Sequence, residues 1–140
     1  ANVGIPLTQR GTSESFWVIT GTTTQKKLSE DVRLVAQSTA TVVILMGMAK
    51  LDEIVDVFSH YGKENTPVGI IQNGTTDNEK SGFGTIKTIE KVVSEKQLTA
   101  PSIIVIGEVV KESHQLPKDL KEASVFSASA YSKFLKIGAA

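Results

Sequence analysis

Apolar runs of strand length recur along this chain, and each run ends at a glycine or a polar turn. Residues 15–20, 41–46, 67–72 and 101–106 are rich in β-branched and aromatic side chains, which predicts strands. The last three runs are nearly continuous, a pattern typical of strands covered on both faces. A shorter strand is predicted over residues 82–85.

Helical spacing of apolar residues separates these strands. It predicts helices over residues 28–37, 51–61 and 86–96. Ser29 is the expected N-cap of the first helix, and Gly62 ends the second. The second helix shows the clearest spacing, with apolar residues at i, i+3, i+4 and i+7: Leu51, Ile54, Val55 and Phe58.

Alternating strands and helices predict an α/β domain with a mixed, largely five-stranded sheet flanked by helices. Small or glycine residues follow three of the strands, at positions 46–47, 73–75 and 106–107. Ligands of open α/β sheets bind beyond the carboxyl ends of the strands. These strand ends are therefore the predicted ligand site.

Composition narrows the class of protein. The 140 residues fit one domain, and 15 basic residues balance 15 acidic ones, so no net field draws the chain to nucleic acid or to a membrane surface. There is no Cys, which excludes thiolate metal sites, and the two His residues argue against a histidine-rich metal site, so no metal is predicted. The apolar runs fall far short of the ~20 residues that span a bilayer, and no signal peptide is visible.

Single residues leave alternatives open. Met46 fits either the core or the flat wall of a cofactor site. Arg10 fits either local surface contacts or an anionic ligand. Glycines after strands either form turns or let backbone approach a ligand. Phe16 and Trp17 are predicted in the core, because Val18 and Ile19 follow them.

Five segments in order carry a family resemblance: residues 4–11 (GIPLTQRG), 16–21 (FWVITG), 41–48 (TVVILMGM), 66–75 (TPVGIIQNGT) and 100–110 (APSIIVIGEVV). Their sequence and order resemble the C-terminal half of tetrapyrrole methylases that use S-adenosylmethionine, in particular the uroporphyrinogen-III C-methyltransferases. This resemblance implies two α/β domains with the cofactor between them, a cytoplasmic homodimer, and a product, precorrin-2, that leads to sirohaem and cobalamin.

The resemblance also implies a division of the chain. Residues 1–110 form the C-terminal methylase domain, with an inter-domain segment at 1–12, and residues 111–140 form an irregular tail. The chain begins at Ala1 rather than Met, which predicts a piece of a longer protein. The glycine-rich cofactor loop and the catalytic residues are then expected in a half that is not present, so the piece alone is predicted to be inactive.

Residue by residue, the resemblance assigns Thr8 and Arg10 to the tetrapyrrole substrate, uroporphyrinogen III. Gln9 stands where the family has His, and Leu45 where it has Tyr, so another precorrin methylase stays an alternative. The resemblance assigns seven residues to the S-adenosylmethionine pocket: Met46, Val68, Gly69, Gly74, Thr75, Pro101 and Ser102.

Two further alternatives belong to other classes of protein. One is a non-catalytic α/β module that binds another nucleotide at the same strand ends. The other is a dimerisation domain that pairs through exposed sheet edges.

Overall fold

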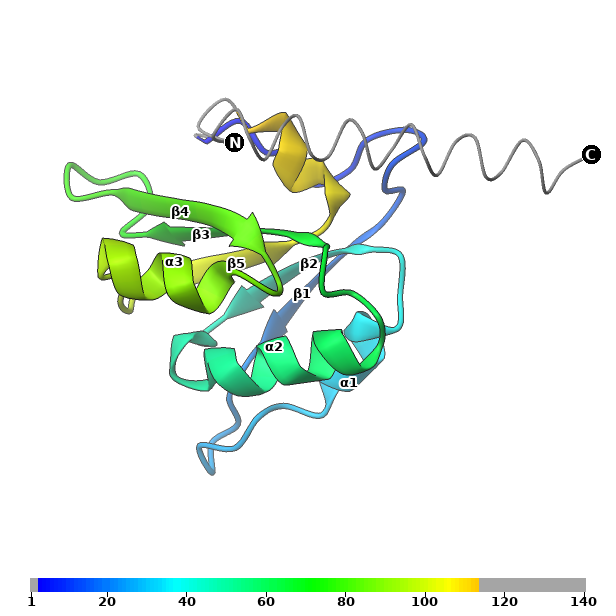
Figure 1. The fold of residues 1–140 in the computed structure, drawn as a ribbon, viewed down its shortest axis with the longest axis horizontal. Helices are drawn as coiled ribbons and strands as arrows, with labels where there is room; N and C mark the ends of the chain where they lie inside the picture. The colour runs from blue at the N-terminus through cyan, green and yellow to red at the C-terminus, as the bar shows by residue number, and fades with distance from the viewer. Residues whose placement is uncertain (1–2, 114–140) are drawn as a thin grey trace, which may run out of the picture.

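The computed structural model describes residues 3–113, and within them five strands form one sheet (Figure 1). The strand order is β1-β2-β5-β3-β4. β1 and β2 are parallel, whereas β2–β5, β5–β3 and β3–β4 are antiparallel, so the prediction of a mixed sheet is confirmed. The strands are β1 (Phe16–Thr20), β2 (Thr41–Leu45), β3 (Pro67–Gln72), β4 (Lys80–Thr85) and β5 (Ser102–Ile106).

The helices are α1 (Asp31–Ala36), α2 (Leu51–His60) and α3 (Ile89–Lys96), with short 3₁₀ turns η1 (Met48–Lys50) and η2 (Glu108–Glu112). α2 lies where the apolar spacing predicts it. α1 begins later than predicted, because a bridge between Thr22 and Leu28 holds Leu28 in a loop. Glu30 therefore takes the N-cap position, although the Ser29 hydroxyl accepts a hydrogen bond from the Asp31 N–H at 3.3 Å.

The predicted tail begins inside this fold. η2 covers residues 108–112, and Ser113 is buried. The remainder, residues 114–140, lies outside the described residues.

The helices cover one face of the sheet (Figure 1). Alternate side chains of β2, β3 and β5 point into this layer, and the α2 residues Ile54 and Phe58 pack against them. β4 passes closely under α3, because a Cβ on Gly82 would lie 2.9 Å from Val92 Cγ1 and one on Gly84 would lie 2.7 Å from Thr88 Oγ1. The strand side chains of this core are Val42, Ile44, Val68, Ile70, Ile104 and Ile106.

Among residues 3–113, cover over the opposite face lies only over its middle. Val3 and Ile5 of the N-terminal segment and Val109 and Val110 of η2 form a second apolar cluster there, together with Phe83 and Val105. Over β1 the described residues provide no such cover.

The prediction that Phe16 and Trp17 lie in the core is therefore wrong. Their side chains are 48% and 42% exposed. β1 is an edge strand, and α1 spans only six residues, too short to shield its outer side. Apolar composition alone does not distinguish an edge strand from a central one.

A buried hydroxyl pair fixes the start of β1 against β2. Ser13 Oγ donates to Ser15 O at 2.9 Å and accepts hydrogen bonds from the Thr41 N–H at 3.1 Å and from Thr41 Oγ1 at 3.0 Å. Thr41 is fully buried, so its hydroxyl has no access to solvent. Buried polar groups that lose a partner cost free energy, which makes this pair a sensitive point of the fold.

We expect Ser13→Ala to lower the free energy of unfolding by ~1–3 kcal/mol, because it leaves the Thr41 hydroxyl buried without its acceptor. Urea unfolding of the four members of a Ser13→Ala and Thr41→Val double-mutant cycle measures the effect. In the Thr41→Val background, Ser13→Ala should cost clearly less. Equal costs in both backgrounds would show that the two hydroxyls are not coupled.

Candidate functional site

The direction of β5 decides which chain segments meet at each end of the sheet. Leu45 pairs with Ile103, and Gln72 pairs with Ser102, so the carboxyl ends of β2 and β3 lie beside the start of β5. The Asn73 N–H also donates to Pro101 O at 3.1 Å. The segments that share this strand-end site are Met46–Gly47, Asn73–Thr75 and Pro101–Ser102.

The expectation for the third strand end is wrong. Because β5 is antiparallel to both neighbours, Gly107 follows Ile106 at the far end of the sheet. There a Cβ on Gly107 would lie 3.4 Å from Thr41 Cα. The carboxyl end of β5 therefore cannot contribute to the site at Met46.

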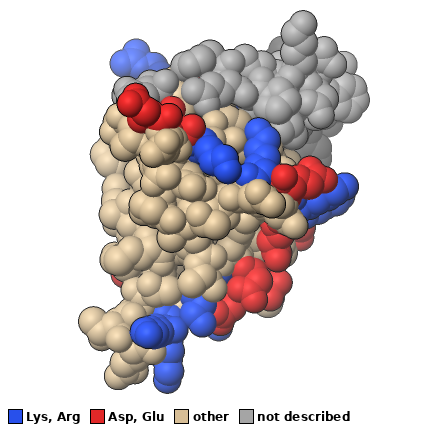
Figure 2. Space-filling model, turned by 90° about the vertical axis from the view of Figure 1, so that its left-hand side faces the viewer, with Lys and Arg blue, Asp and Glu red and all other residues tan. Residues whose placement is uncertain are grey.

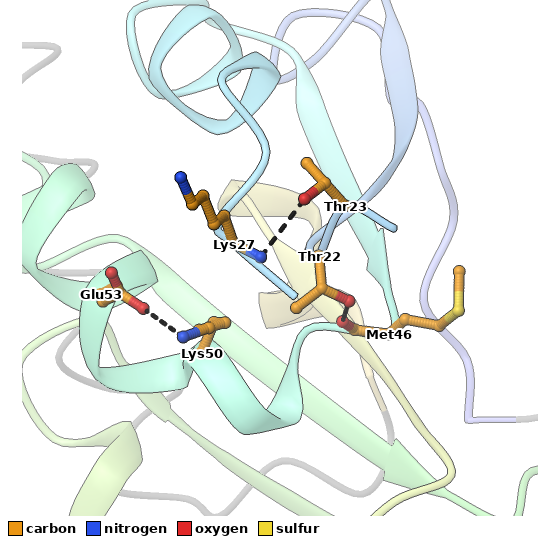
Figure 3. A network of polar contacts seen from close by, with 6 residues as sticks. All are labelled: Thr22, Thr23, Lys27, Met46, Lys50 and Glu53. Atoms are coloured by element: carbon orange, nitrogen blue, oxygen red, sulfur yellow. Dashed lines mark hydrogen bonds and ion pairs between the residues drawn. The ribbon is translucent and has the colours of Figure 1, made fainter. Parts of the chain in front are cut away.

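Met46 projects its thioether out of the fold. Its backbone is left-handed, with φ 52°, and the residue is 66% exposed. Thr22 Oγ1 donates to Met46 O at 3.0 Å, and in Figure 3 the Met46 side chain extends away from this bond. Of the two roles that the sequence leaves open, the exposure excludes the core.

Two glycines hold the loops of this site together. A Cβ on Gly21 would lie 2.7 Å from Gly47 Cα and 3.0 Å from Ile44 Cγ2. The Gly21 N–H donates to Leu45 O at 2.7 Å, which extends the β1–β2 ladder up to Met46. Real Cβ atoms do not approach backbone this closely, so the contact requires glycine at position 21.

Neighbouring polar contacts frame the same loops (Figure 3). The Lys27 N–H donates to Thr23 Oγ1 at 3.2 Å, which closes the loop that follows β1. An ion pair joins Lys50 and Glu53 at 3.2 Å at the start of α2. Its partly exposed side chains indicate a small contribution to stability.

The Asn73–Thr75 turn is also strained. Asn73 and Thr75 have φ of 51° and 67°, and the second value is unfavourable for a β-branched residue. Glu79 stabilises the turn, because its Oε1 accepts from the Thr75 N–H at 3.0 Å. Left-handed non-glycine residues thus occur after both β2 and β3, and such strain concentrates at functional sites.

The strand residues beside Met46 are apolar. Leu45 and Ile103, paired across β2 and β5, are 37% and 39% exposed. Figure 2 views the molecule from the side of these strand ends and shows a broad area without charged side chains, with Lys, Arg, Asp and Glu gathered toward its margins. The site therefore offers a flat apolar wall.

Other residues that the resemblance assigns to ligands lie elsewhere. Val68 is fully buried among the core residues under the helices, about 13 Å along β3 from Gln72 at ~3.3 Å per residue. A Cβ on Gly69 would face the opposite side, 3.1 Å from Phe83 Cε1. The structure does not bring these two residues to Met46.

Arg10 is exposed in a tight turn closed by the bridge between Gln9 and Ser13, and the exposed Thr8 directly precedes this turn. This turn precedes β1, whereas Met46 lies next to the end of β1. Thr8 and Arg10 therefore also lie away from the strand-end site.

The sequence interpretation missed Gly21, Thr22 and Ile103. Gly21 was visible only as a turn residue after a strand. The parallel register of β1 and β2 is what places it and Thr22 against Met46, and sequence periodicity does not report register.

Two polar features lie outside the strand-end site. A shallow hollow of about 250 Å³ on the helix side is lined by Arg33, Asp56, Val57, His60 and Tyr61. Burial lowers the pKa of the Lys63 ammonium, which donates to Ser38 O shortly before β2 begins. Within residues 3–113, no group of three or more His, Asp or Glu side chains gathers to hold a metal ion, and no helix there is long and apolar enough to cross a membrane.

The structure is thus a mixed α/β domain in which an apolar wall with an exposed methionine lies at the strand ends. The sequence profile of the tetrapyrrole (corrin/porphyrin) methylases matches residues 1–90, and the chain belongs to this family.

Its relatives are more specific. The chain is 38% identical over 109 residues to the uroporphyrinogen-III C-methyltransferase of Methanocaldococcus jannaschii, which covers 76% of this chain and 45% of that protein. It is 34% identical to the siroheme synthase of Nitrosomonas eutropha, over 81% of this chain and 24% of that protein.

The solved structures agree on the fold. Uroporphyrin-III C-methyl transferase of Thermus thermophilus, in complex with S-adenyl homocysteine, superposes with a TM-score of 0.66 at 24% identity, over 77% of this chain and 48% of that one. The chain therefore spans about half of this structure, as it spans about half of the Methanocaldococcus relative.

We expect Gly21→Ala to lower the free energy of unfolding by ~1–3 kcal/mol, because the new methyl group overlaps Gly47. Gly74→Ala is the matched control at the same end of the sheet, since its Cβ would meet only ordinary contacts, the nearest at 3.4 Å. Thermal and urea unfolding measure both. If Gly21→Ala is as stable as Gly74→Ala, the close approach of the two loops is not a feature of the protein.

Proposed function

We propose that this chain is the C-terminal half of a methyltransferase that uses S-adenosylmethionine to methylate uroporphyrinogen III to precorrin-2, on the route to sirohaem and cobalamin. The names of the relatives support the proposed reaction. The coverage of about half of the Methanocaldococcus enzyme supports the proposal that this chain is one half of such an enzyme. The structural observation that carries the proposal is the exposed Met46 thioether on an uncharged wall at the strand ends.

The strand-end site fits one side of this cofactor. The thioether of Met46 and the apolar Leu45 and Ile103 provide surface for an adenosine ring. Gly74 has no side chain to obstruct a ligand, and the strained Asn73–Thr75 turn gives it a fixed position. We assign Pro101 and Ser102 to the same wall, because they lie beside that turn.

When bound, S-adenosylmethionine supplies an electrophilic methyl group on a sulfonium. The residues of this chain then hold the adenosine part of the cofactor, fix the orientation of the cofactor and exclude water. Correct positioning is the main requirement for bringing a methyl group to a nucleophilic carbon. The wall formed by Leu45, Met46 and Ile103 suits a reaction in which the positive charge spreads from sulfur, because these three side chains carry no carboxylate that would stabilise the ground-state sulfonium.

The remaining assignments depend on the other half of the proposed enzyme. We propose that Thr8 and Arg10 contact the carboxylates of the tetrapyrrole, for which an exposed guanidinium is suited. The Val68 side chain is buried, so we propose that Val68 and Gly69 contact the cofactor through their backbone groups. This contact requires that the complete protein leaves those backbone groups accessible. The homodimer and the cytoplasmic location stay predictions.

A second candidate is a methylase for another tetrapyrrole. Leu45, which stands where the family has Tyr, is exposed beside Met46. A smaller apolar side chain at this position changes the shape of the wall. This change affects the choice of tetrapyrrole substrate more than the assignment as a methylase.

We expect isothermal calorimetry to detect no tight binding of S-adenosylhomocysteine to the 140-residue chain, because this chain provides only one wall of the cofactor pocket. Joining the unmatched half of the Methanocaldococcus relative to this chain should restore one site per chain and methylation of uroporphyrinogen III. In that joined protein, Met46→Ala should weaken binding ~tenfold, from the loss of one buried thioether.

Leu34→Ala is the matched control, since Leu34 is 57% exposed on α1, on the helix side. It should leave binding unchanged. Tight binding to the isolated chain at one site per chain would contradict the half-site proposal, and binding without methylation would favour a non-catalytic module.

A further inference from the structure

The backbone at Met46 turns sharply out of β2. Its φ of 52° lies in the left-handed region, which costs free energy for a residue that carries a Cβ. The residue is 66% exposed, so packing against the fold does little to hold this conformation. A left-handed residue persists only where its surroundings determine its backbone. The contacts of the Met46 backbone therefore decide where its thioether lies.

Two consecutive carbonyls at the end of β2 accept hydrogen bonds from residues that follow β1. The Gly21 N–H donates to Leu45 O at 2.7 Å. Thr22 Oγ1 donates to Met46 O at 3.0 Å (Figure 3). In an extended strand, consecutive carbonyls point to opposite sides, toward different neighbouring strands. The left-handed turn brings the Met46 carbonyl to the same side as that of Leu45, so the bond from Thr22 is specific to this conformation.

Thr22 is itself held by the loop that follows β1. It forms an antiparallel bridge with Leu28. The Ser29 N–H donates to Gly21 O at 2.9 Å, and the Thr23 N–H donates to Lys27 O at 2.8 Å. These contacts close residues 22–28 into a small loop that begins beside the end of β2. The Thr22 hydroxyl is therefore fixed where the Met46 carbonyl needs a donor.

The turn after β3 is held differently. Thr76 Oγ1 donates to Asn73 O at 2.6 Å, and the Thr75 N–H donates to Glu79 Oε1 at 3.0 Å. Both bonds stay within one loop, whereas Thr22 lies 24 residues before Met46 in the chain. The conformation of Met46 thus depends on a contact between two strand ends, and a side-chain hydroxyl supplies that contact.

We infer that Thr22 is a positioning residue for the cofactor: its hydroxyl holds Met46 in the conformation that places the thioether on the wall. This inference rests on the proposed function, because it concerns how the proposed cofactor wall is built. Thr22 acts through Met46 and needs no contact with the cofactor. Where Met46 samples several conformations, only the competent fraction binds, so the apparent affinity falls in proportion to that fraction.

Calorimetry with S-adenosylhomocysteine on the joined two-half protein tests the inference. Thr22→Val keeps the β-branched shape and removes the donor, so it should weaken binding about threefold to tenfold, which corresponds to the loss of one hydrogen bond. Thr22→Ser keeps the hydroxyl and should bind like the wild type. An unchanged affinity in Thr22→Val, or an equal loss in Thr22→Ser, would overturn the inference.

Thr41→Val is the matched control, because it is the same substitution at the start of β2, at the far end of the sheet from Met46. It removes the buried hydroxyl that donates to Ser13 Oγ at 3.0 Å, so it changes stability without touching the strand-end site. Its affinity for S-adenosylhomocysteine should equal that of the wild type. If Thr41→Val weakens binding as much as Thr22→Val, the loss reflects general destabilisation and the inference is wrong.

A double-mutant cycle with Met46→Ala shows whether Thr22 acts through Met46. In the Met46→Ala background there is no thioether to position, so Thr22→Val should weaken binding clearly less than it does in the wild type. Equal losses in the two backgrounds would mean that Thr22 serves the site by another route, which overturns the inference.

Proton NMR on the 140-residue chain without cofactor separates this inference from the proposed function. A left-handed residue brings its own amide and α protons close together, so the wild type should show a strong NOE between these two protons of Met46. The NOE should weaken in Thr22→Val and remain in Thr22→Ser. An unchanged Met46 NOE in Thr22→Val overturns this inference alone. A wild-type joined protein that does not bind the cofactor contradicts the proposed function, and with it any cofactor role of Thr22.

Discussion

The antiparallel register of β5 is the constraint on which the site depends. β5 lies between β2 and β3 and runs against both, so its start shares an end of the sheet with their carboxyl ends. With β5 reversed, Gly107 would lie beside Met46 and Pro101 would lie at the far end. The hydrogen bond from the Asn73 N–H to Pro101 O joins the end of β3 to the segment before β5. Two turns with left-handed backbone, one after β2 and one after β3, contain exposed residues of the site.

The helices cover one face of the sheet, and this asymmetry explains the rest of the surface. The buried face receives Ile and Val from three strands and supplies the main hydrophobic core. Within the described part of the chain, Ile5, Phe83 and Val110 close the second face only in its middle. Apolar side chains toward β1 and toward the strand ends stay exposed as a result. The chain spans 45% of the Methanocaldococcus relative and 24% of the Nitrosomonas one, and exposed apolar surface of this kind is typical of places where another domain or molecule binds.

The sequence predicts those parts of the fold that depend on periodicity. The buried strands at residues 41–46 and 67–72 and the helix at 51–61 follow from runs and spacings that each lie within one element. Strand direction and register depend on distant segments, and periodicity carries no record of them. For this reason Met46 and Gly74 could be associated from the sequence, whereas Gly107 was placed at the wrong end and Trp17 was assigned to the core.

The site shows the same division. The family resemblance points to single positions such as Met46, and it carries no information about the left-handed backbone of that residue. It does not find Thr22 or Gly21, which hold that conformation from the neighbouring strand. It also does not predict that the Val68 side chain is buried in the hydrophobic core.

The most direct test of the strand-end site is methyl NMR of the joined two-half protein, with ¹³C-methyl methionine, during titration with S-adenosylhomocysteine. This chain contributes two methionines: Met46, exposed at the site, and Met48, packed against the helix-side core. Alanine variants assign the two signals. The account predicts that the Met46 methyl signal shifts on binding while the Met48 signal stays nearly in place. Binding that leaves the Met46 signal unchanged would contradict it.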